Sequence, residues 1–279
     1  MNAPLVDVSV VIPAYQAADT IERALASIAL QTVCPREVIV IDDGSDDDTV
    51  ARALEYSGQV ANAELIVHKQ PNQGAGAARN AGVKLAAQPI IAFLDADDDW
   101  LAEHLEISLG ILNENGLTLT AHNEWLVEEG QERLNDSTAR LTQWADPFVS
   151  IFCKGCISTS TVLVRRDAIA AAGGFDPSLA NGQDVDLWLA ILNEPGATFE
   201  IFEQPLSRYF IRPGSINSHA ARRYSFFNRI ALRWARAVVH RPGAGLRALW
   251  FRVAAIHFEA AKSLWAERNL SRLLGVFFM

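Results

Sequence analysis

The sequence contains few cysteines, no long apolar run and no leader-like N-terminus. Three cysteines among 279 residues are too few for a disulfide framework, so we expect a reducing, cytoplasmic environment. No apolar run reaches the ~18 residues that a membrane-spanning helix needs. The N-terminal segment mixes acidic and apolar residues and lacks the order of a signal peptide. Half of the residues are apolar and 20% are charged, the balance of a globular protein rather than a disordered one.

Acidic and basic residues are segregated along the chain. Residues 206–279 contain 13 Lys and Arg but only 2 acidic residues. The remaining 11 basic and 31 acidic residues lie in residues 1–205, which therefore carry a net charge of −20. This division indicates an acidic body with a basic tail. Because an acidic surface repels phosphate backbones, we expect no nucleic-acid partner.

Strands and helices alternate through the N-terminal part of the chain. Unbroken β-branched runs predict buried strands, and apolar residues at helical intervals predict helices. The expected strands are residues 8–12, 37–41, 63–68 and 89–94, and the expected helices are residues 20–30, 49–56 and 74–86. This alternation predicts an α/β fold with a mostly parallel central sheet and helices on both faces. Ligands of such sheets bind beyond the carboxyl ends of the strands.

The rest of the chain has a less regular pattern. It predicts helices over residues 102–115, 167–172 and 184–192, and strands over residues 117–127 and 157–164. From about residue 220 the sequence predicts Arg- and Trp-rich helices, interrupted at Pro242-Gly243. We therefore expect a body of residues 1–220, with halves 1–100 and 101–220, and a basic helical extension of residues 221–279.

Two groups of acidic residues follow predicted strands. Asp42-Asp43 follows one strand, and the segment DADDD at residues 95–99 follows another. The carboxylates of the second group would repel one another strongly unless a cation lies among them. Oxygen ligands of this kind suit Mg²⁺ or Mn²⁺ carrying substrate phosphates. The alternative is a solvated turn in which Asp98 or Asp99 caps the next helix.

A glycine-rich segment precedes the helix predicted over residues 74–86. Gly74-Ala75-Gly76 matches neither the dinucleotide-binding pattern GxGxxG nor a P-loop, which argues against both functions. Its small residues also suit close packing of the helix on the sheet. Arg79 stands on this otherwise Ala- and Gly-rich helix, either as a ligand-binding residue or as a surface cation.

Five segments considered together give a more specific indication. They read VSVVIPAYQAADT, EVIVIDDGSDDDT, NQGAGAARNAG, IIAFLDADDDW and STSTVLVRRDAIAAAGGFDPSL, the last followed by GQDVDLWLAI. In order and spacing they resemble the family 2 glycosyltransferases over residues 7–217, about three quarters of the chain. The resemblance implies a GT-A fold, a nucleotide-diphosphate-sugar donor, a divalent metal ion and inversion at the anomeric carbon.

The resemblance also implies roles for residues of the donor site. Pro13, Ala14 and Tyr15 would border the nucleobase, with Tyr15 stacked on it or beside it. Asp43 would accept the uracil N3–H, and Asp42 would support the turn. Three further donor contacts are implied: Arg79 near the base and diphosphate, Asp95 on the ribose, and Arg212 over the diphosphate.

Asp97 and Asp184 carry the chemistry that the resemblance implies. Asp97 would bind the Mn²⁺ or Mg²⁺ that bridges both phosphates, and Asp184 would be the general base. Gln183 stands where the family usually has an acid, which leaves Asp184 as the base candidate of this pair. Phe210 and Arg212 stand where the family's YRxH pattern has Arg and His.

These residues predict an inverting, metal-dependent sugar transferase. We expect a UDP-sugar as donor and a hydroxyl of a saccharide or lipid-linked saccharide as acceptor, in cell-surface polysaccharide synthesis. The alternative is a non-catalytic nucleotide-sugar-binding or scaffold protein of the same fold, against which the retained Asp43, Asp97 and Asp184 argue. A nucleotidyltransferase would need a basic phosphate-binding loop near the first strand, and the sequence contains none.

Residues 221–279 are open to two interpretations. Arginines beside Trp and Phe on helices fit an element lying on an anionic membrane leaflet, which would place the protein at the inner face of the plasma membrane. The same residues fit a helical hairpin packed on the acidic body, with aromatics in the core or in the seam of a homodimer.

Two further features have structural explanations. Cys153 and Cys156 form a CxxC motif without a second pair or a histidine cluster, so we expect no zinc or redox site. Trp188 is expected in the core rather than as a platform for a sugar, because aromatics at helical spacing usually face inward.

Overall fold

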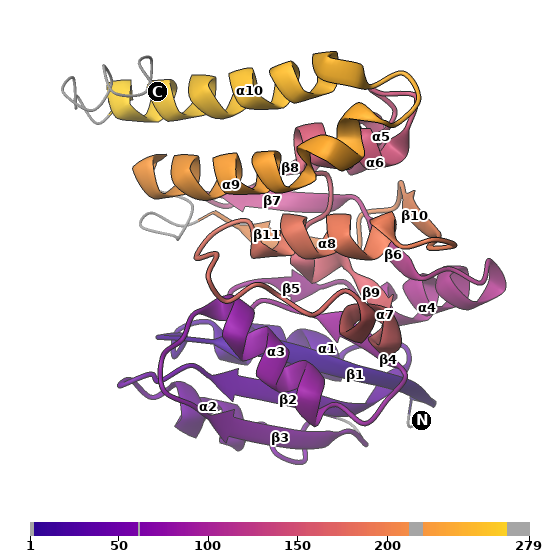
Figure 1. Cartoon of the computed structure of the whole chain (residues 1–279). Helices are drawn as coiled ribbons and strands as arrows, with labels where there is room; N and C mark the ends of the chain where they lie inside the picture. Colours follow the sequence, from indigo (N-terminus) through magenta and orange to yellow (C-terminus); the bar gives the residue numbers. More distant parts are fainter. Residues whose placement is uncertain (1–2, 61, 212–219, 267–279) are drawn as a thin grey trace.

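The computed structural model describes residues 3–60, 62–211 and 220–266, and its central feature is a seven-stranded sheet (Figure 1). The strand order is β10-β6-β9-β4-β1-β2-β3. The strands are β1 (Leu5–Ala14), β2 (Cys34–Asp42), β3 (Glu64–Lys69), β4 (Ile90–Phe93), β6 (Leu119–His122), β9 (Leu163–Arg165) and β10 (Phe199–Phe202). β9 runs antiparallel to β4 and β6, whereas the other neighbours are parallel. The predicted α/β fold with a mostly parallel sheet is confirmed.

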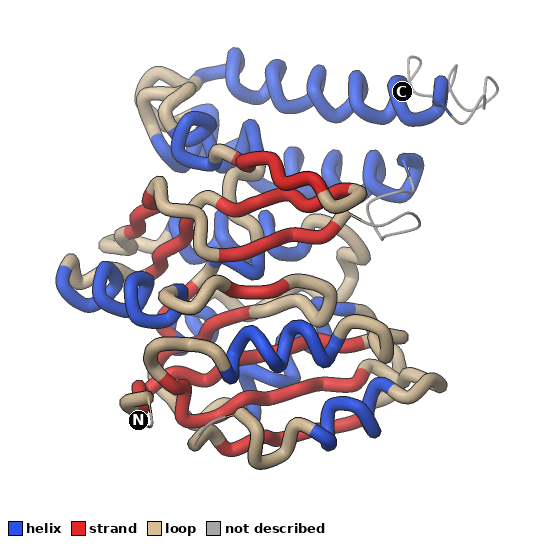
Figure 2. The backbone as a smooth tube through the Cα atoms, turned by 180° about the vertical axis from the view of Figure 1, so that it is seen from behind, coloured by secondary structure: helices blue, strands red, loops and turns tan. Residues whose placement is uncertain are grey.

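Helices cover both faces of this sheet (Figures 1 and 2). Val11 of β1 belongs to the core on one face, while Val10 and Ile12 belong to the core on the other. This double burial explains why the strands are unbroken apolar runs. The helices on the Val10 side are α1 (Ile21–Ala29), α2 (Thr49–Glu55) and α4 (His104–Glu114), and those on the Val11 side include α3 (Ala75–Leu85), α6 (Pro147–Lys154), α7 (Arg166–Ala171) and α8 (Gln183–Asn193).

A smaller sheet lies between the large sheet and the C-terminal helices (Figures 1 and 2). It consists of β5 (Asp99–Trp100), β11 (Ser207–Phe210), β7 (Glu124–Glu128) and β8 (Gln131–Asn135), in that order. The single strand predicted over residues 117–127 is wrong, because the chain leaves the large sheet after His122 and enters the small one at Glu124. Asn123 holds this break, since its side-chain oxygen accepts the backbone N–H groups of Ser137 at 2.8 Å and Thr138 at 3.1 Å.

The strand predicted over residues 157–164 is also wrong for most of its length. Residues Thr159–Thr161 form a 3₁₀ turn, and extended structure begins at Leu163. The hydroxyl of Thr161 donates to the carbonyl of Ser158 at 2.8 Å, and the hydroxyl of Ser160 donates to Asp98 at 2.6 Å. Ser and Thr side chains bonded in this way compete with strand pairing.

Two short helices precede this turn in a stretch without a clear sequence pattern. They are α5 (Ser137–Leu141) and α6, and each begins after an aspartate whose side chain accepts a helix N–H. Asp136 accepts the N–H of Ala139, and Asp146 accepts the N–H of Phe148. Both caps stabilise helices too short to persist alone.

The C-terminal helices α9 (Ala220–Val239) and α10 (Gly245–Ala266) form a hairpin on top of α8 and α6 (Figure 1). The predicted break at Pro242-Gly243 is confirmed, and Gly243 has a φ of 73°. Ile230 of α9 and Ile256 of α10 belong to the same buried core as α8. None of the described helices combines the length and apolar character that crossing a membrane requires. The domain boundary near residue 220 stays a prediction.

Arginines of α9 and of the turn after it bind the body of the protein. Arg233 of α9 forms ion pairs with Asp176 at 2.6 Å and with Asp186, and Arg241, just after α9, lies 3.3 Å from Asp146. The indole N–H of Trp234 donates to Asp186 at 2.9 Å. For α9 the contacts therefore favour a hairpin packed on the acidic body.

Gly82 is the point where α3 approaches the sheet most closely among the glycines of that helix. A Cβ atom at Gly82 would lie 2.4 Å from Cγ1 of Val11 in β1, which has no exposed surface. Gly110 of α4 offers a contrast, since a Cβ atom there would meet nothing within 4 Å. Gly82 thus serves helix–sheet packing, whereas a Cβ atom at Gly74 would meet nothing within 4 Å and one at Gly76 would meet Gln183 and Phe175.

We expect Gly82→Ala to destabilise the protein by ~1–3 kcal/mol, because the added methyl group overpacks a rigid core. Gly110→Ala should be neutral or stabilise the protein by up to ~1 kcal/mol, since it removes a helix-interior glycine without a clash. Denaturant unfolding of both variants measures the two free energies. Equal effects of the two substitutions would contradict the packing described for α3.

Candidate active site

The carboxyl ends of β1, β2 and β4 lie next to one another at one edge of the large sheet. Ala14 pairs with Asp42 in the β1–β2 register, and the N–H of Asp43 donates to the carbonyl of Ala14 at 2.8 Å. On the other side of β1, the N–H of Leu94 donates to the carbonyl of Val11 at 3.1 Å. The polar segments that follow these strands therefore start side by side, as a parallel sheet requires.

Asp42 lies under the turn that follows β2. Its carboxylate is fully buried, accepts the backbone N–H of Ser45 at 3.2 Å and lies 3.4 Å from the ammonium group of Lys69. Gly44 between them has a φ of 82°, and a Cβ atom there would lie 2.9 Å from the backbone nitrogen of Asn72. The structure places Asp42 where it holds the turn, away from solvent.

Asp43 ties the same turn to the segment before α3. Its carboxylate accepts the backbone N–H groups of Gln73 at 2.9 Å and Gly74 at 2.7 Å, and the side-chain amide of Gln70 at 2.7 Å. A carboxylate offers about four lone-pair positions, so one further donor can be accommodated. The predicted contact with a uracil N3–H requires that capacity.

The β1 end presents an aromatic ring to solvent. Ala14 is buried and Pro13 half-buried, whereas Tyr15 is 54% exposed. Gln16 follows with a φ of 50°, uncommon for a residue other than glycine, and its N–H donates to the hydroxyl of Ser45 at 2.9 Å. This turn leaves the Tyr15 ring available for stacking, and the sequence pattern gave no indication of the strained residue after it.

Arg79 is a buried cation, so its interpretation as a surface residue is wrong. Its side chain is 7% exposed and its Nη2 lies 2.6 Å from Oδ1 of Asp95. The guanidinium also lies 5.5 Å from the centre of the Phe175 ring. Its Nε has no hydrogen-bond partner among the described residues. Arg79 thus brings α3 and the end of β4 together around a positive charge.

The positions of Asp98 and Asp99 contradict the alternative in which residues 95–99 form a solvated turn. Both are buried, and neither caps α4, whose N-cap is Glu103. The hydroxyl of Ser160 and the backbone N–H of Phe210 donate to the Asp98 carboxylate at 2.6 and 3.3 Å. Burial raises the pKa of Asp98 well above its usual range, and the neighbouring carboxylates raise it further.

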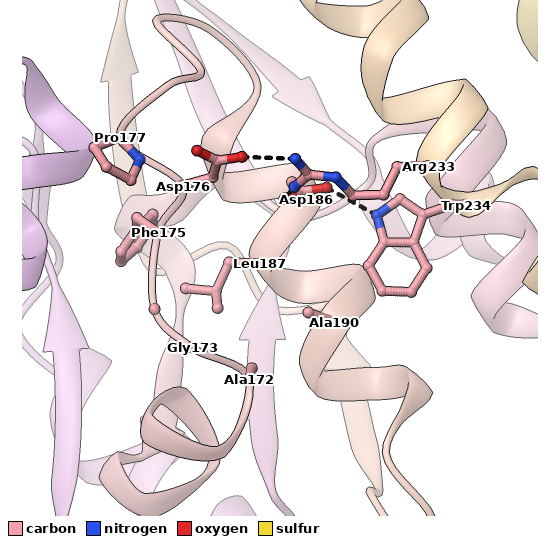
Figure 3. A pocket seen from close by; sticks show the side chains of 11 residues that line it. Ala172, Gly173, Phe175, Asp176, Pro177, Asp186, Leu187, Ala190, Arg233 and Trp234 are labelled. Atoms are coloured by element: carbon pink, nitrogen blue, oxygen red, sulfur yellow. Dashed lines mark hydrogen bonds and ion pairs between the residues drawn. The ribbon is translucent and has the colours of Figure 1, made fainter.

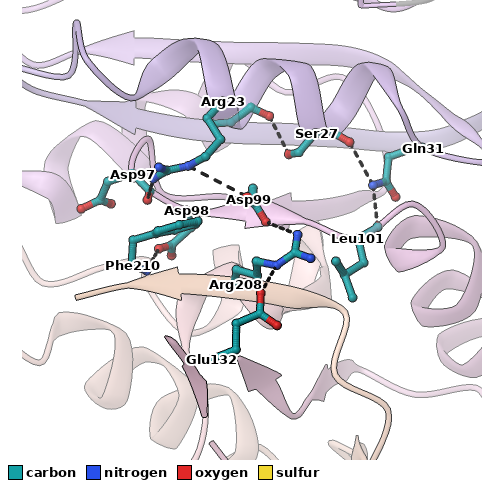
Figure 4. A network of polar contacts seen from close by, with 11 residues as sticks. Arg23, Ser27, Gln31, Asp97, Asp98, Asp99, Leu101, Glu132, Arg208 and Phe210 are labelled. Carbon is teal, nitrogen blue, oxygen red and sulfur yellow. Dashed lines mark hydrogen bonds and ion pairs between the residues drawn. The ribbon is translucent and has the colours of Figure 1, made fainter. Parts of the chain in front are cut away.

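Asp97 differs from these two residues because its side chain is half-exposed. Arg23 donates to its backbone carbonyl, and Figure 4 shows its carboxylate pointing away from Asp99 and Arg208. Within residues 3–60, 62–211 and 220–266, no three His, Cys, Asp or Glu side chains are grouped to hold a metal ion by themselves. Mg²⁺ and Mn²⁺ often take one or two carboxylates and complete their shell with phosphates and water. Asp97 fits that mode of binding.

A network of charges fixes the backbone around Asp97 (Figure 4). Arg208 of β11 lies 3.3 Å from Asp99 and 2.7 Å from Glu132 of β8. Arg23 of α1 lies 4.0 Å from the other Asp99 oxygen, and its guanidinium stacks 3.5 Å from the Phe210 ring centre. Burial raises the pKa of Asp99, and the charge of Arg208 opposes this rise. The sequence pattern did not indicate this network, because its members are far apart along the chain.

Asp184 lies in the first turn of α8, near Arg79 and Asp95. The hydroxyl of Thr159 donates to its carboxylate at 3.4 Å. Burial raises the pKa of Asp184, while the charge of Arg79 opposes the rise and that of Asp95 adds to it. A partly exposed carboxylate with a raised pKa is suited to accepting a proton near neutral pH. The structure thus brings Arg79, Asp95 and Asp184 together.

Two positions depart from the family pattern, and a third lies outside the described residues. Gln183 is buried, and its Cγ would lie 3.3 Å from a Cβ atom at Gly76, so it packs against the start of α3. Phe210 packs under Arg23 instead of supplying a charge. Arg212, predicted over the diphosphate, lies outside the described residues.

A pocket of about 460 Å³ lies between the segment after α7, the helix α8 and the helix α9 (Figure 3). Asp176, Asp186, Arg233 and Trp234 line it, and these four side chains bond to one another. Their hydrogen-bonding groups are committed to holding α9 on the body. The pocket is therefore part of the α8–α9 contact and not of the site around Arg79.

The cysteine pair and Trp188 belong to the core. Cys153 and Cys156 are buried and free, and burial raises the pKa of Cys153 to about 12 and of Cys156 to about 11. Thiols that stay protonated are poor redox groups and metal ligands. Trp188 has no exposed surface and lies against Phe93 and Phe175. The expectation that it is a core residue is confirmed.

Known proteins share this sequence and fold. The family model of glycosyl transferase family 2 matches residues 9–159. The chain belongs to glycosyl transferase family 2. This glycosyltransferase is 31% identical over 233 residues to the amylovoran biosynthesis glycosyltransferase AmsB of Erwinia amylovora, covering 78% of this chain and 75% of AmsB. It is 28% identical over 213 residues to the UDP-Glc:alpha-D-GlcNAc-diphosphoundecaprenol beta-1,3-glucosyltransferase WfgD of Escherichia coli, covering 76% and 80% of the two chains.

Solved structures share the GT-A fold of this glycosyltransferase. S. aureus TarS 1-349 in complex with UDP-GlcNAc superposes with a TM-score of 0.67 at 20% identity, over 93% of this chain and 72% of that one. The mannosyltransferase PcManGT from Pyrobaculum calidifontis, in complex with GDP-Man and Mn²⁺, superposes with a TM-score of 0.66 at 18% identity, over 94% and 75%. The predicted family and fold are thereby confirmed, while the roles of individual residues stay predictions.

We expect Arg208→Met to destabilise the glycosyltransferase by ~1–3 kcal/mol, because it removes the nearer of two cations from the Asp99 carboxylate, whose side chain is 13% exposed, and leaves only Arg23 at 4.0 Å. The matched control is Arg36→Met, which breaks an ion pair with Asp7 whose side chains are 48% and 62% exposed. Exposed pairs contribute ~0.2–1 kcal/mol, so the control should change little. Thermal or denaturant unfolding compares the two, and a smaller loss for Arg208→Met than for Arg36→Met would refute the role of the network.

Proposed function

We propose that this glycosyltransferase moves a sugar from a UDP-sugar to a hydroxyl of a saccharide or lipid-linked saccharide, with inversion at the anomeric carbon. The observation that carries the proposal is the convergence of Arg79, Asp95 and Asp184 at the carboxyl edge of the sheet. One cation and two carboxylates from three different elements meet there. The phosphates of a donor need a cation, and the hydroxyl of an acceptor needs a carboxylate that can take its proton, and both groups must lie at one place.

The donor would lie across the ends of β1, β2 and β4. Tyr15 is exposed, and it lies beside the turn that contains the Asp43 carboxylate. This arrangement suits a nucleobase that stacks on the Tyr15 ring and donates one hydrogen bond to Asp43. Asp95 follows β4 and would reach the ribose. Arg79 would then face the diphosphate, whose negative charge grows as the sugar leaves, and its buried position strengthens that attraction.

The relatives support UDP-sugars and lipid-linked acceptors as the substrate classes. WfgD is named for transfer from UDP-Glc to GlcNAc-diphosphoundecaprenol, and TarS was crystallised with UDP-GlcNAc. Other relatives are named for amylovoran, succinoglycan and teichuronic acid biosynthesis. These names support a role in cell-surface polysaccharide synthesis.

Asp97 is the residue that would hold a divalent metal ion. Such an ion, when bound, supplies positive charge that stabilises the departing nucleoside diphosphate. The structure of PcManGT contains GDP-Man and Mn²⁺, which supports a divalent metal ion in this proposal. Arg23 donates to the backbone carbonyl of Asp97 and so holds the backbone of this residue in place.

Asp184 would take the proton from the acceptor hydroxyl as that oxygen attacks the anomeric carbon. Its raised pKa makes it a stronger base than an exposed aspartate, and the charge of Arg79 opposes the rise in its pKa. Attack and departure on opposite sides of the same carbon invert its configuration. A lipid-linked acceptor would also keep the enzyme at a membrane surface, so we include peripheral membrane contact through residues 221–279 in the proposal.

We expect Asp184→Asn to lower turnover by ~10²–10⁴ while UDP affinity changes little, because the amide cannot accept the proton. In the unsubstituted enzyme, turnover should be lost as the pH falls through the raised pKa of Asp184, at a higher pH than an ordinary aspartate would give. Initial rates across pH and calorimetry with UDP measure both quantities. The control is Asp167→Asn at an exposed position of α7. Near-normal transfer by Asp184→Asn would assign the base to another group.

We expect Asp97→Ala to remove most of the Mn²⁺-dependent part of UDP affinity, because it deletes the proposed ligand. Calorimetry with UDP in Mn²⁺ and in EDTA separates that part from the rest. Asp167→Ala serves as the control, and thermal unfolding shows that both variants fold. Equal UDP affinity of the unsubstituted protein in Mn²⁺ and in EDTA would rule out a metal-assisted donor site.

A further inference from the structure

The outer side of α10 is an exposed apolar surface. The strongly exposed residues of this helix are Leu246, Arg247, Trp250, Phe251, Ala254, Phe258, Glu259, Lys262 and Trp265, which we name the outer face of α10. Within it, Leu246 is 62%, Trp250 71%, Phe258 66% and Trp265 70% exposed. A folded protein rarely leaves several large apolar side chains together on one helix without a partner.

The inner side of α10 shows that this exposure is a feature of one face and not of a loosely placed helix. Ala248, Arg252, Ile256 and Ala260 follow one another at intervals of four residues and are all buried. The guanidinium of Arg252 donates to the carbonyl of Cys153 at 3.2 Å and lies 4.9 Å from the Phe227 ring centre. The helix is therefore held on the body by one side, and its aromatic side faces outward.

The charge of the protein is complementary to an anionic surface at this end. Arg247 and Lys262 belong to the outer face of α10, against the single acid Glu259. On the exposed edge of α9, Arg236 adds a basic group. Residues 1–205, which form the body beneath α9, have a net charge of −20, and α10 is the outermost layer at this end of the molecule (Figure 1). Near an anionic surface, this separation of basic and acidic groups would turn α10 toward the surface and the acidic body away from it.

We propose that the outer face of α10 lies on the headgroup region of an anionic phospholipid bilayer. Trp and Phe beside Arg and Lys on one helix face are what an interfacial helix presents to lipid, where rings reach the acyl boundary and cations stay at the phosphates. A second copy of the chain fits less well, because an isologous contact would bring the same basic groups face to face. The biological purpose, access to a lipid-linked acceptor, rests on the proposed function.

The position of α10 connects this surface to the proposed base. α8, α9 and α10 are successive layers (Figure 1), and a Cβ atom at Gly182, just before α8, would lie 2.9 Å from Ile230 of α9. Phe227 of α9 contacts both Gly182 and Arg252 of α10. The first turn of α8, which carries Asp184, is thus packed through α9 against the membrane-facing helix. Docking would fix the orientation of Asp184 relative to the bilayer.

α9 is excluded as the docking helix by its own contacts. Arg233 is paired with Asp176 and Asp186, and Arg229 donates to Ser178 of the body. A large apolar side chain that α9 leaves exposed is Leu232, 75% exposed. Leu232 therefore provides a matched control, an equally exposed apolar residue outside the outer face of α10.

The test is sedimentation of the full-length protein with vesicles of phosphatidylcholine alone or mixed in equal parts with phosphatidylglycerol. Binding should require phosphatidylglycerol and weaken as salt rises. The double variant Trp250→Ser/Phe258→Ser should lower the partition constant by roughly tenfold or more for each aromatic removed. Arg247→Gln/Lys262→Gln should lower it by roughly fivefold per charge at low salt. Leu232→Ser should bind like the unsubstituted protein.

Several outcomes would overturn the proposal. One is recovery of the unsubstituted protein in the supernatant with phosphatidylglycerol vesicles at low salt. Another is equal loss of binding in Leu232→Ser and the double variant. A third is light scattering that shows a dimer dissociated by the double variant while vesicle binding is unchanged, which would identify a second copy as the occupant. Unchanged thermal unfolding and UDP affinity show that the variants fold. Vesicle binding needs no donor, so its result is independent of whether the proposed sugar transfer is correct.

Discussion

The candidate site depends on the ion pair between the buried Arg79 and the partly exposed Asp95. Its two members come from α3 and from the end of β4, and the guanidinium also faces Phe175 and opposes the rise that burial causes in the pKa of Asp184. Several carboxylates gather at this edge, and without a cation among them their repulsion would be large. Arg79 reduces that repulsion and places a positive charge where a diphosphate would bind. The same residue therefore serves both the folding of the site and its chemistry.

The rest of the fold holds this cation and these acids in place. Gly82 lets α3 lie directly on Val11, which sets the depth of Arg79 against the sheet. The charges of Arg23, Arg208 and Glu132 surround Asp99 and fix the segment that carries Asp97. α8 brings Asp184 from the second half of the chain, and α9 and α10 cover α8 from outside. Each of these helices holds the one beneath it: α10 packs on α9, and α9 packs on α8, which carries the proposed base Asp184.

Much of the N-terminal half could be predicted from the sequence, because β1, β2 and β4 contain unbroken apolar runs that end at polar turns. The second half was harder for a physical reason. The side chains of Asn123, Ser158 and Ser160 form hydrogen bonds with backbone N–H groups or carboxylates. These bonds interrupt strands that the neighbouring residues favour. The motifs located Asp43, Arg79, Asp95 and Asp184 at one edge. They gave no sign of the contacts of Arg23 and Arg208, which arise only when segments far apart in sequence meet.

The central claim is that one site binds a nucleotide sugar with its diphosphate near Arg79. The sugar is then transferred to an acceptor hydroxyl in a single displacement that Asp184 assists. The most direct measurement is incubation with a panel of nucleotide sugars and saccharide acceptors in Mn²⁺, followed by assay of released nucleotide and proton NMR of the product. The account predicts release of UDP and a new linkage of anomeric configuration opposite to that of the donor. A product with retained configuration would contradict it.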